Sequence, residues 1–178
     1  MAISRRSAFA IWITGLPASG KSTIAAAVKS QLAARGVDIA VLESDALRAI
    51  LTPHPNYSEE ERDQFYRQMV YIGMLLIEHG VPVLFDATAN LRIYRARARK
   101  QIPQFLEIYV ECPLATCMDR DPKGIYRQAL EGGAAKVPGL QTPYEPPETP
   151  DLVLHCDEEA PEAAARVVRR LTEIGWAR

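Results

Sequence analysis

The sequence has few cysteines, almost no net charge and no long apolar run, and each deficit excludes a class of protein. Three cysteines fit neither a disulfide framework nor the spacing of a zinc site, which indicates reduced thiols and a cytoplasmic protein. A net charge of −1 provides no general field for nucleic acid, so we expect no nucleic-acid partner. The apolar stretch near the N-terminus spans about six residues, too few for a signal peptide or a membrane span, so we expect no membrane association.

What the sequence does contain predicts one α/β domain. A chain of 178 residues with 48% hydrophobic content suits a single domain over residues 1–178 with a substantial core. Helical periodicity alternates with short apolar runs, and Ser58 followed by Glu61 forms a capping-box signature at the start of a long helix. Because strands separated by helices imply parallel crossovers, we expect a three-layer α/β sandwich, with a mainly parallel five-stranded sheet and helices on both faces. The expected strands are 9–14, 38–43, 81–86, 105–111 and 151–155.

The most informative motif is a phosphate loop, G-x-x-x-x-G-K-S, which follows the first expected strand and precedes a helical pattern. Its glycines let backbone N–H groups face the phosphates of a nucleoside triphosphate, its lysine reaches the β and γ oxygens, and its serine hydroxyl can bind Mg²⁺. The order of strand, loop and helix favours this interpretation over a chance glycine-rich turn. We therefore expect ATP to bind to Gly15, Leu16, Pro17, Ala18, Ser19, Gly20, Lys21, Ser22 and Thr23.

Two carboxylates follow other expected strands and should reach the same cleft, because ligands of parallel sheets bind beyond the carboxyl ends of the strands. Asp45 precedes Arg48 by about one helical turn, and we interpret it as the general base or orienter of an acceptor hydroxyl. The alternative is an N-cap for a helix beginning at Ala46, and both roles can hold. Asp86 ends an apolar strand, the pattern that holds Mg²⁺ in P-loop proteins, so Ser22 and Asp86 are the expected metal ligands.

Basic residues beyond these strands are candidates for binding transferred or acceptor phosphates. Arg92, Arg95 and Arg99 share one face of an expected helix; a solvated basic face is the alternative, and Arg92 is nearest the cleft. Residues 119–150 are first charged and then proline-rich, which predicts either an ordinary surface loop or, from its position, a lid and substrate-covering loop. Within that segment Arg120 and Lys123 are candidates for groups that close over the phosphates. The expected catalytic set is Lys21, Asp45, Arg120 and Lys123.

These residues resemble the adenylylsulfate kinases, P-loop kinases of sulfate assimilation that phosphorylate the 3′-hydroxyl of adenosine 5′-phosphosulfate with Mg-ATP. The most specific segments are 120–126, Arg-Asp-Pro-Lys-Gly-Ile-Tyr, and 139–148, Gly-Leu-Gln-Thr-Pro-Tyr-Glu-Pro-Pro-Glu. The resemblance covers nearly the whole chain and implies a P-loop kinase fold with a lid, a small-molecule acceptor and a homodimer. The acceptor-binding residues that it implies are Asp45, Arg48, Arg62, Arg67, Arg92 and Lys123.

Departures from the family pattern gather on the acceptor side. Phe65 replaces an asparagine of the long helix, while Ala87 and Val137 fall where the family has phenylalanines that stack on the acceptor's adenine. Stacking contributes about 1–3 kcal/mol per base, so the loss of two rings would weaken adenine binding by about two to four orders of magnitude. Tyr57, Phe65 or Tyr144 could supply replacement surface.

Three functions remain open at this point. The first is adenylylsulfate kinase activity. The second is a kinase of the same ancestry with another hydroxylated acceptor, because residues 86–90 also resemble the Asp-x-Thr-Asn segment of small kinases that act on polynucleotide ends or small metabolites. The third is a nucleotide-dependent regulatory protein without an acceptor, against which Asp45 and the expected lid both count.

Overall fold

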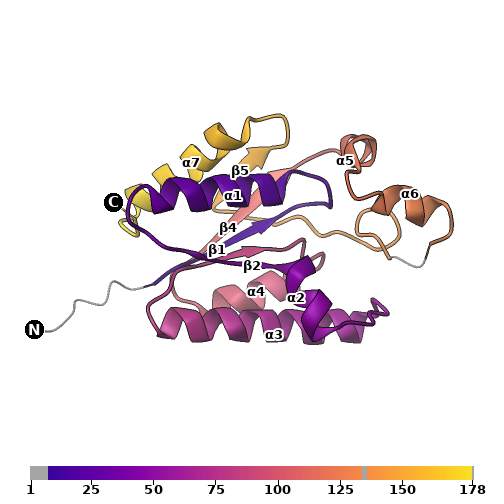
Figure 1. Cartoon of the computed structure of the whole chain (residues 1–178), viewed down its shortest axis with the longest axis horizontal. Helices are drawn as coiled ribbons and strands as arrows, with labels where there is room; N and C mark the ends of the chain where they lie inside the picture. Colours follow the sequence, from indigo (N-terminus) through magenta and orange to yellow (C-terminus); the bar gives the residue numbers. More distant parts are fainter. Residues whose placement is uncertain (1–7, 134–135, 178) are drawn as a thin grey trace, which may run out of the picture.

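Five strands form the centre of the computed structural model, which describes residues 8–133 and 136–177 (Figure 1). They are β1 (Ala10–Thr14), β2 (Ala40–Glu43), β3 (Val83–Asp86), β4 (Phe105–Glu111) and β5 (Leu152–His155). Every neighbouring pair is parallel, and the order across the sheet is β2-β3-β1-β4-β5. The predicted α/β fold with a five-stranded parallel sheet is confirmed, and each strand begins within two residues of its expected start.

Two stretches with sequence-based expectations lie outside the described residues. Residues 1–7 belong to the part of the chain for which we expect no signal peptide, and residues 134–135 belong to the expected lid segment. Within the described ranges, no helix is long and apolar enough to cross a membrane.

Helices cover both faces of the sheet (Figure 1). One face carries α1 (Lys21–Ala33) and α7 (Ala160–Glu173), and the other carries α2 (Ser44–Leu51), α3 (Glu59–Glu78) and α4 (Arg92–Gln101). Side chains of β1 alternate between the two layers: Ile11 and Ile13 pack with α1 and α7, while Trp12 packs with α3 and α4. Beyond the carboxyl end of β4 lie α5 (Leu114–Arg120), whose last residues overlap the start of the expected lid segment, and α6 (Ile125–Leu130), which lies within that segment.

The N-terminus of α3 is fixed by the predicted capping residues. The Ser58 hydroxyl accepts a hydrogen bond from the Glu61 N–H at 3.2 Å, which confirms half of the capping box. The Glu61 carboxylate accepts from the N–H groups of Asn56 and Tyr57, at 2.7 and 3.2 Å, instead of returning to Ser58. These bonds fix the loop in which Tyr57 adopts a left-handed backbone conformation, φ 54°, rare for an aromatic residue.

Arginines of α4 fasten the loop after residue 136 to the sheet. Arg95 is 1% exposed; it donates to a Glu107 carboxylate oxygen of β4 and to the Glu145 carbonyl oxygen, both at 2.6 Å. Arg92 pairs with Glu148 of the same loop at 2.5 Å. The interpretation as a solvated basic face is therefore wrong for Arg95, which is buried. It holds in part for Arg92 and Arg99, whose side chains are 45% and 41% exposed.

Candidate active site

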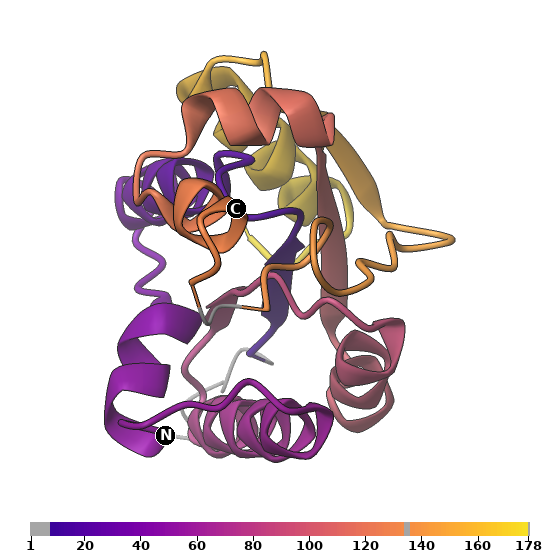
Figure 2. The ribbon, with the colours of Figure 1, turned by 90° about the vertical axis from the view of Figure 1, so that its right-hand side faces the viewer.

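A cavity of about 560 Å³ lies beyond the carboxyl ends of β1, β2 and β3, where the sequence predicts the ligand site. Figure 2 faces this end of the molecule, with α5 and α6 above and α2 and α3 below. The walls come from the phosphate loop, the β2–α2 junction, the start of α3, the end of β3 and two parts of the expected lid segment. Segments far apart in the sequence therefore converge on one site.

The phosphate loop curls around one end of the cavity. Of its expected ATP-binding residues, six line the cavity and three do not: the lining ones are Pro17, Ala18, Gly20, Lys21, Ser22 and Thr23, and the others are Gly15, Leu16 and Ser19. A Cβ atom on Gly15 would lie 2.7 Å from the Val110 carbonyl oxygen, so only glycine fits where the loop approaches β4. Gly20 adopts φ 101° immediately before the first turn of α1, a conformation that also favours glycine.

Lys21 carries a buried positive charge in the loop. The side chain is 8% exposed, and its ammonium donates to the Leu16 carbonyl oxygen at 2.8 Å. Burial lowers the pKa of Lys21, while the nearby Asp86 carboxylate acts in the opposite direction. Burial removes the water that would otherwise stabilise the charge of this ammonium. A phosphate bound here would provide a negative partner for it.

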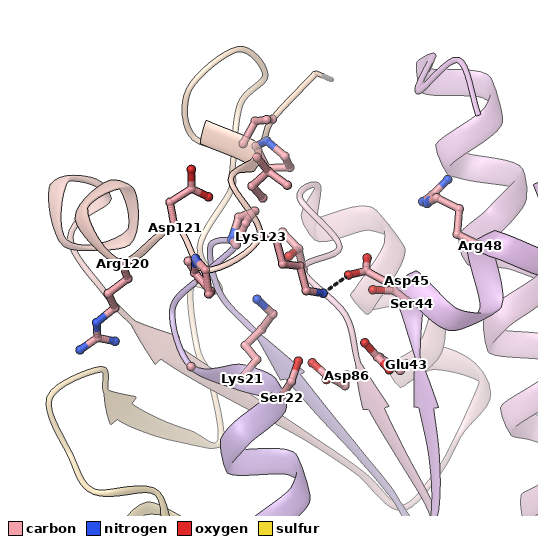
Figure 3. Close-up of a pocket in the computed structure, with 18 of the residues that line it drawn as sticks. Lys21, Ser22, Glu43, Ser44, Asp45, Arg48, Asp86, Arg120, Asp121 and Lys123 are labelled. Carbon is pink, nitrogen blue, oxygen red and sulfur yellow. Dashed lines mark hydrogen bonds and ion pairs between the residues drawn. The ribbon is translucent and has the colours of Figure 1, made fainter. Parts of the chain in front are cut away.

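Three oxygen-bearing side chains beside Lys21 could hold a metal ion. Figure 3 shows Ser22, Glu43 and Asp86 close together at the ends of α1, β2 and β3. Glu43 and Asp86 are register partners of adjacent strands, which places their carboxylates side by side. A hydroxyl with one or two carboxylates is the hard donor set that suits Mg²⁺ in combination with substrate phosphates. Glu43 was expected at the cleft as a strand-end residue but not as a metal ligand, although it ends β2 in the same way as Asp86 ends β3.

Asp45 and Lys123 form an ion pair across the cavity, with 2.5 Å between Lys123 Nζ and Asp45 Oδ2 (Figure 3). The hydrogen bond to Asp45 raises the pKa of Lys123. α2 begins at Ser44 with Glu43 in the N-cap position, so the interpretation of Asp45 as an N-cap is wrong. Its carboxylate lines the cavity instead, within the first turn of α2.

Arg120 borders two cavities. In Figure 3 its guanidinium is turned away from Lys21, and it donates to the Cys156 carbonyl oxygen at 2.7 Å. The second cavity, of about 600 Å³, is lined by Arg120 together with Cys112, His155 and Cys156 among others. The structure therefore does not place the Arg120 guanidinium over the phosphate loop, where the sequence predicts it.

Arg48 and Arg62 line the end of the cavity farthest from Lys21 and are 9% and 7% exposed. Arg62 donates to the carbonyl oxygens of Tyr57 and Lys136, at 3.3 and 2.6 Å. The Cζ atoms of both arginines lie 5.4 Å from the centroid of the Tyr57 ring. Tyr57 also lines the cavity, so this end combines two guanidiniums with one aromatic ring.

Only one of the two lost phenylalanine positions belongs to the cavity. Val137 lines it, as the resemblance implies. Ala87 is 0% exposed and packs in the core instead, because side chains of an extended segment alternate and its neighbours Asp86 and Thr88 take the cavity side. The expectation that a missing ring at position 87 removes stacking surface from the acceptor site is therefore wrong.

Four other residues expected on the acceptor side do not line the cavity. Arg67 is exposed on α3 and pairs with an aspartate of the same helix at 2.6 Å. Arg92 is occupied by the loop after residue 136, as described above. Phe65 is 1% exposed, and Tyr144 stacks on Tyr109 with its hydroxyl 3.0 Å from the Thr14 hydroxyl. Direct contact of these side chains with an acceptor is therefore not favoured by the geometry.

A parallel sheet with a phosphate loop and a strand-end carboxylate that line one cavity is the arrangement of a P-loop nucleotide-binding enzyme. The family model described as adenylylsulphate kinase matches residues 7–155. The chain is 40% identical over 167 residues to an adenylyl-sulfate kinase of Microcystis aeruginosa, covering 93% of this chain and 92% of that one. It is 35% identical, with a TM-score of 0.88, to the Mycobacterium tuberculosis APS kinase solved in complex with AMPPNP and APS, covering 93% of this chain and 98% of that one. The chain therefore belongs to the adenylylsulphate kinase family and is a kinase.

Proposed function

We propose that the protein transfers the γ-phosphoryl group of ATP to the 3′-hydroxyl of adenosine 5′-phosphosulfate, which gives 3′-phosphoadenosine 5′-phosphosulfate. The observation that carries this proposal is one cavity lined by the phosphate loop, by Asp45 and by two buried arginines. Figure 3 shows Asp45 between Lys21 and one of these arginines, Arg48. Such a cavity accommodates two anionic substrates whose reacting groups meet near the carboxylate. The names of the relatives support the same reaction.

ATP binds through its phosphates at the phosphate loop, where backbone N–H groups and the Lys21 ammonium neutralise their charge. Ser22 and Asp86 are the proposed holders of Mg²⁺, with Glu43 beside them. When bound, Mg²⁺ neutralises charge on the phosphates during transfer. The donor chemistry of these three side chains supports this assignment.

We place the base of ATP in the second cavity. Arg120 lines both cavities, so a nucleotide with its phosphates on the loop can extend past this side chain. A planar guanidinium stacks well on an aromatic base, and the Cys156 carbonyl oxygen already fixes the guanidinium of Arg120 at 2.7 Å. In this arrangement Arg120 acts on ATP binding and not on the transferred phosphoryl group.

Asp45 is the proposed acceptor of the proton from the attacking hydroxyl. Its carboxylate lies in the cavity and is 2.5 Å from the Lys123 ammonium, which can turn to the transferred phosphoryl group once the hydroxyl takes its place. Arg48 and Arg62 are placed to hold the phosphosulfate, and the Tyr57 ring offers an aromatic face for the adenine.

Two coarser assignments accompany this function. We propose that residues 119–150 act as lid and substrate loop of a single domain over residues 1–178, which is supported by the contact between Lys123 and Asp45 across the cavity. We also propose a cytoplasmic location, supported by the three cysteines, all of which are free thiols.

Coupled measurement of ADP release, with ATP, Mg²⁺ and adenosine 5′-phosphosulfate, tests the function. We expect saturable turnover that is lost on chelation of Mg²⁺ and in Asp45→Asn, but retained in Asp38→Asn, whose side chain is exposed outside the cavity. Protein that binds ATP yet releases no additional ADP with this acceptor would contradict the proposal.

A different hydroxylated acceptor is the second candidate. Val137 favours it, because this position lines the cavity without supplying a ring for a purine. A panel of sugars, polyols and nucleosides in the same ADP-release assay distinguishes the two. The second function is supported if one of them gives a higher kcat/KM than adenosine 5′-phosphosulfate.

A further inference from the structure

The guanidinium of Arg48 lies over the ring of Phe65. The distance from Arg48 Cζ to the ring centroid is 3.9 Å, shorter than the 5.4 Å to the Tyr57 ring. Phe65 is 1% exposed and does not line the cavity, whereas Arg48 does. The ring of Phe65 is thus a floor beneath the guanidinium, on the side away from the cavity.

An aromatic ring beneath an arginine fixes the orientation of its guanidinium while leaving the N–H groups free to donate hydrogen bonds. A guanidinium has five N–H groups in its plane, and stacking on a ring occupies its face without using any of them. Among residues 8–133 and 136–177, Arg48 makes one charged contact, 3.5 Å from Nη1 to Glu61 Oε1, so most of its N–H groups stay available toward the cavity. An amide side chain at position 65, the residue type of the family pattern, would compete for those N–H groups as a hydrogen-bond acceptor.

This end of the cavity holds more buried positive than negative charge, so carboxylates alone do not hold the two guanidiniums in place. Arg48 and Arg62 are both buried, and Glu61 is the only carboxylate that pairs with either within the described residues. That carboxylate already accepts two backbone N–H groups, from Asn56 and Tyr57. Burial lowers the pKa of Arg62, and the charge of Arg48 acts in the same direction.

We propose that Phe65 is a positioning residue for the acceptor: by stacking beneath Arg48, it holds that guanidinium with its N–H groups toward the phosphosulfate. The inference rests on the proposed function, because it concerns the acceptor end of the same cavity. Phe65 acts only through Arg48, so its contribution belongs to acceptor binding and not to ATP binding or to the chemical step.

Steady-state kinetics of three variants test this role. Phe65→Leu should raise the KM for adenosine 5′-phosphosulfate about tenfold, the effect expected when a desolvated cation–π contact is lost, with kcat and the KM for ATP within about twofold of the wild type. Phe65→Tyr keeps the aromatic face and should restore the acceptor KM. Phe105→Leu is the matched control, because Phe105 belongs to the same core cluster but begins β4 at the end of the sheet away from the cavity.

Equal acceptor KM values for Phe65→Leu and Phe105→Leu would overturn the inference, as would a rise in the KM for ATP as large as that for the acceptor. If the wild-type protein shows no turnover with adenosine 5′-phosphosulfate, the proposed function fails first. Calorimetric titration of inorganic sulfate into the ADP-loaded protein then decides: an approximately tenfold weaker Kd in Phe65→Leu than in the wild type supports the positioning role, and equal values contradict it.

Discussion

Lys123 Nζ lies 2.5 Å from Asp45 Oδ2, and this contact joins the segment after α5 to the first turn of α2 across the mouth of the cavity. The two side chains are 61% and 68% exposed, and ion pairs this open to water contribute only about 0–1 kcal/mol to stability. The ion pair therefore holds the two segments together only weakly, and a substrate that enters the cavity can separate Lys123 from Asp45. In the proposed function, both partners become available for chemistry when the acceptor hydroxyl enters between them.

Replacing Asp45 should separate activity from stability. Asp45→Asn removes the proposed proton acceptor, and loss of a positioned general base lowers kcat by about 10²- to 10⁴-fold. The melting temperature should stay within about 2 °C of the wild type, because the pair with Lys123 is exposed. Coupled ADP release and thermal unfolding measure the two effects. A variant that loses activity only in proportion to its folded fraction would show that Asp45 is structural.

Lys21→Met should stabilise the free protein while abolishing ATP turnover. Burial lowers the pKa of Lys21, so the unfolded chain binds this proton more tightly than the folded protein does. The charged side chain therefore lowers stability at neutral pH, and this penalty fades as the pH rises through the lowered pKa toward the ordinary value of about 10.4. We expect a melting temperature about 2–4 °C higher at pH 7, with a smaller gain at pH 9.5.

The matched control for this substitution is Lys29→Met, on the exposed side of the same helix, which should leave the melting temperature unchanged at both pH values. A lower melting temperature for Lys21→Met would mean that Asp86 and the Leu16 carbonyl oxygen already compensate for the burial of the ammonium.

Arg95→Met should destabilise the protein strongly. It breaks a buried ion pair and leaves Glu107 without the 2.6 Å hydrogen bond from Arg95, a change that costs about 3–5 kcal/mol in comparable buried pairs. For a chain of this size we expect the melting temperature to fall by about 10 °C. Arg99→Met on the same helix removes a side chain that is 41% exposed and should have little effect. Similar melting temperatures for the two variants would contradict the anchoring role of Arg95.

The features predicted correctly from the sequence depend on local signals. Apolar runs and the capping serine of α3 depend on neighbouring residues, so the five strands and Ser58 were found. The phosphate loop was found for the same reason, since nine consecutive residues make it. Parallel topology then brings Asp45 and Asp86 to one edge of the sheet without further information.

Side-chain directions that depend on distant segments were not predictable in this way. Arg92 follows a strand end, yet Glu148, which lies 56 residues further on, draws its guanidinium out of the site. The direction of Ala87 was within reach, since an extended segment in which Asp86 and Thr88 line the cavity must turn residue 87 to the core. Tyr57 required the structure, because its position follows from a left-handed turn held by Glu61.

Val137→Phe provides the sharpest test of the acceptor. Position 137 lines the cavity beside Lys136, whose carbonyl oxygen accepts from Arg62, so a ring there would lie near the proposed acceptor end. If the acceptor carries a purine, the added ring should lower its KM about tenfold, since stacking contributes about 1–3 kcal/mol per base. Val137→Leu adds volume without an aromatic face and is the control. An improvement of equal size in both variants would indicate apolar filling, and a higher KM in Val137→Phe alone would indicate an acceptor without a base, because the ring then only narrows the cavity.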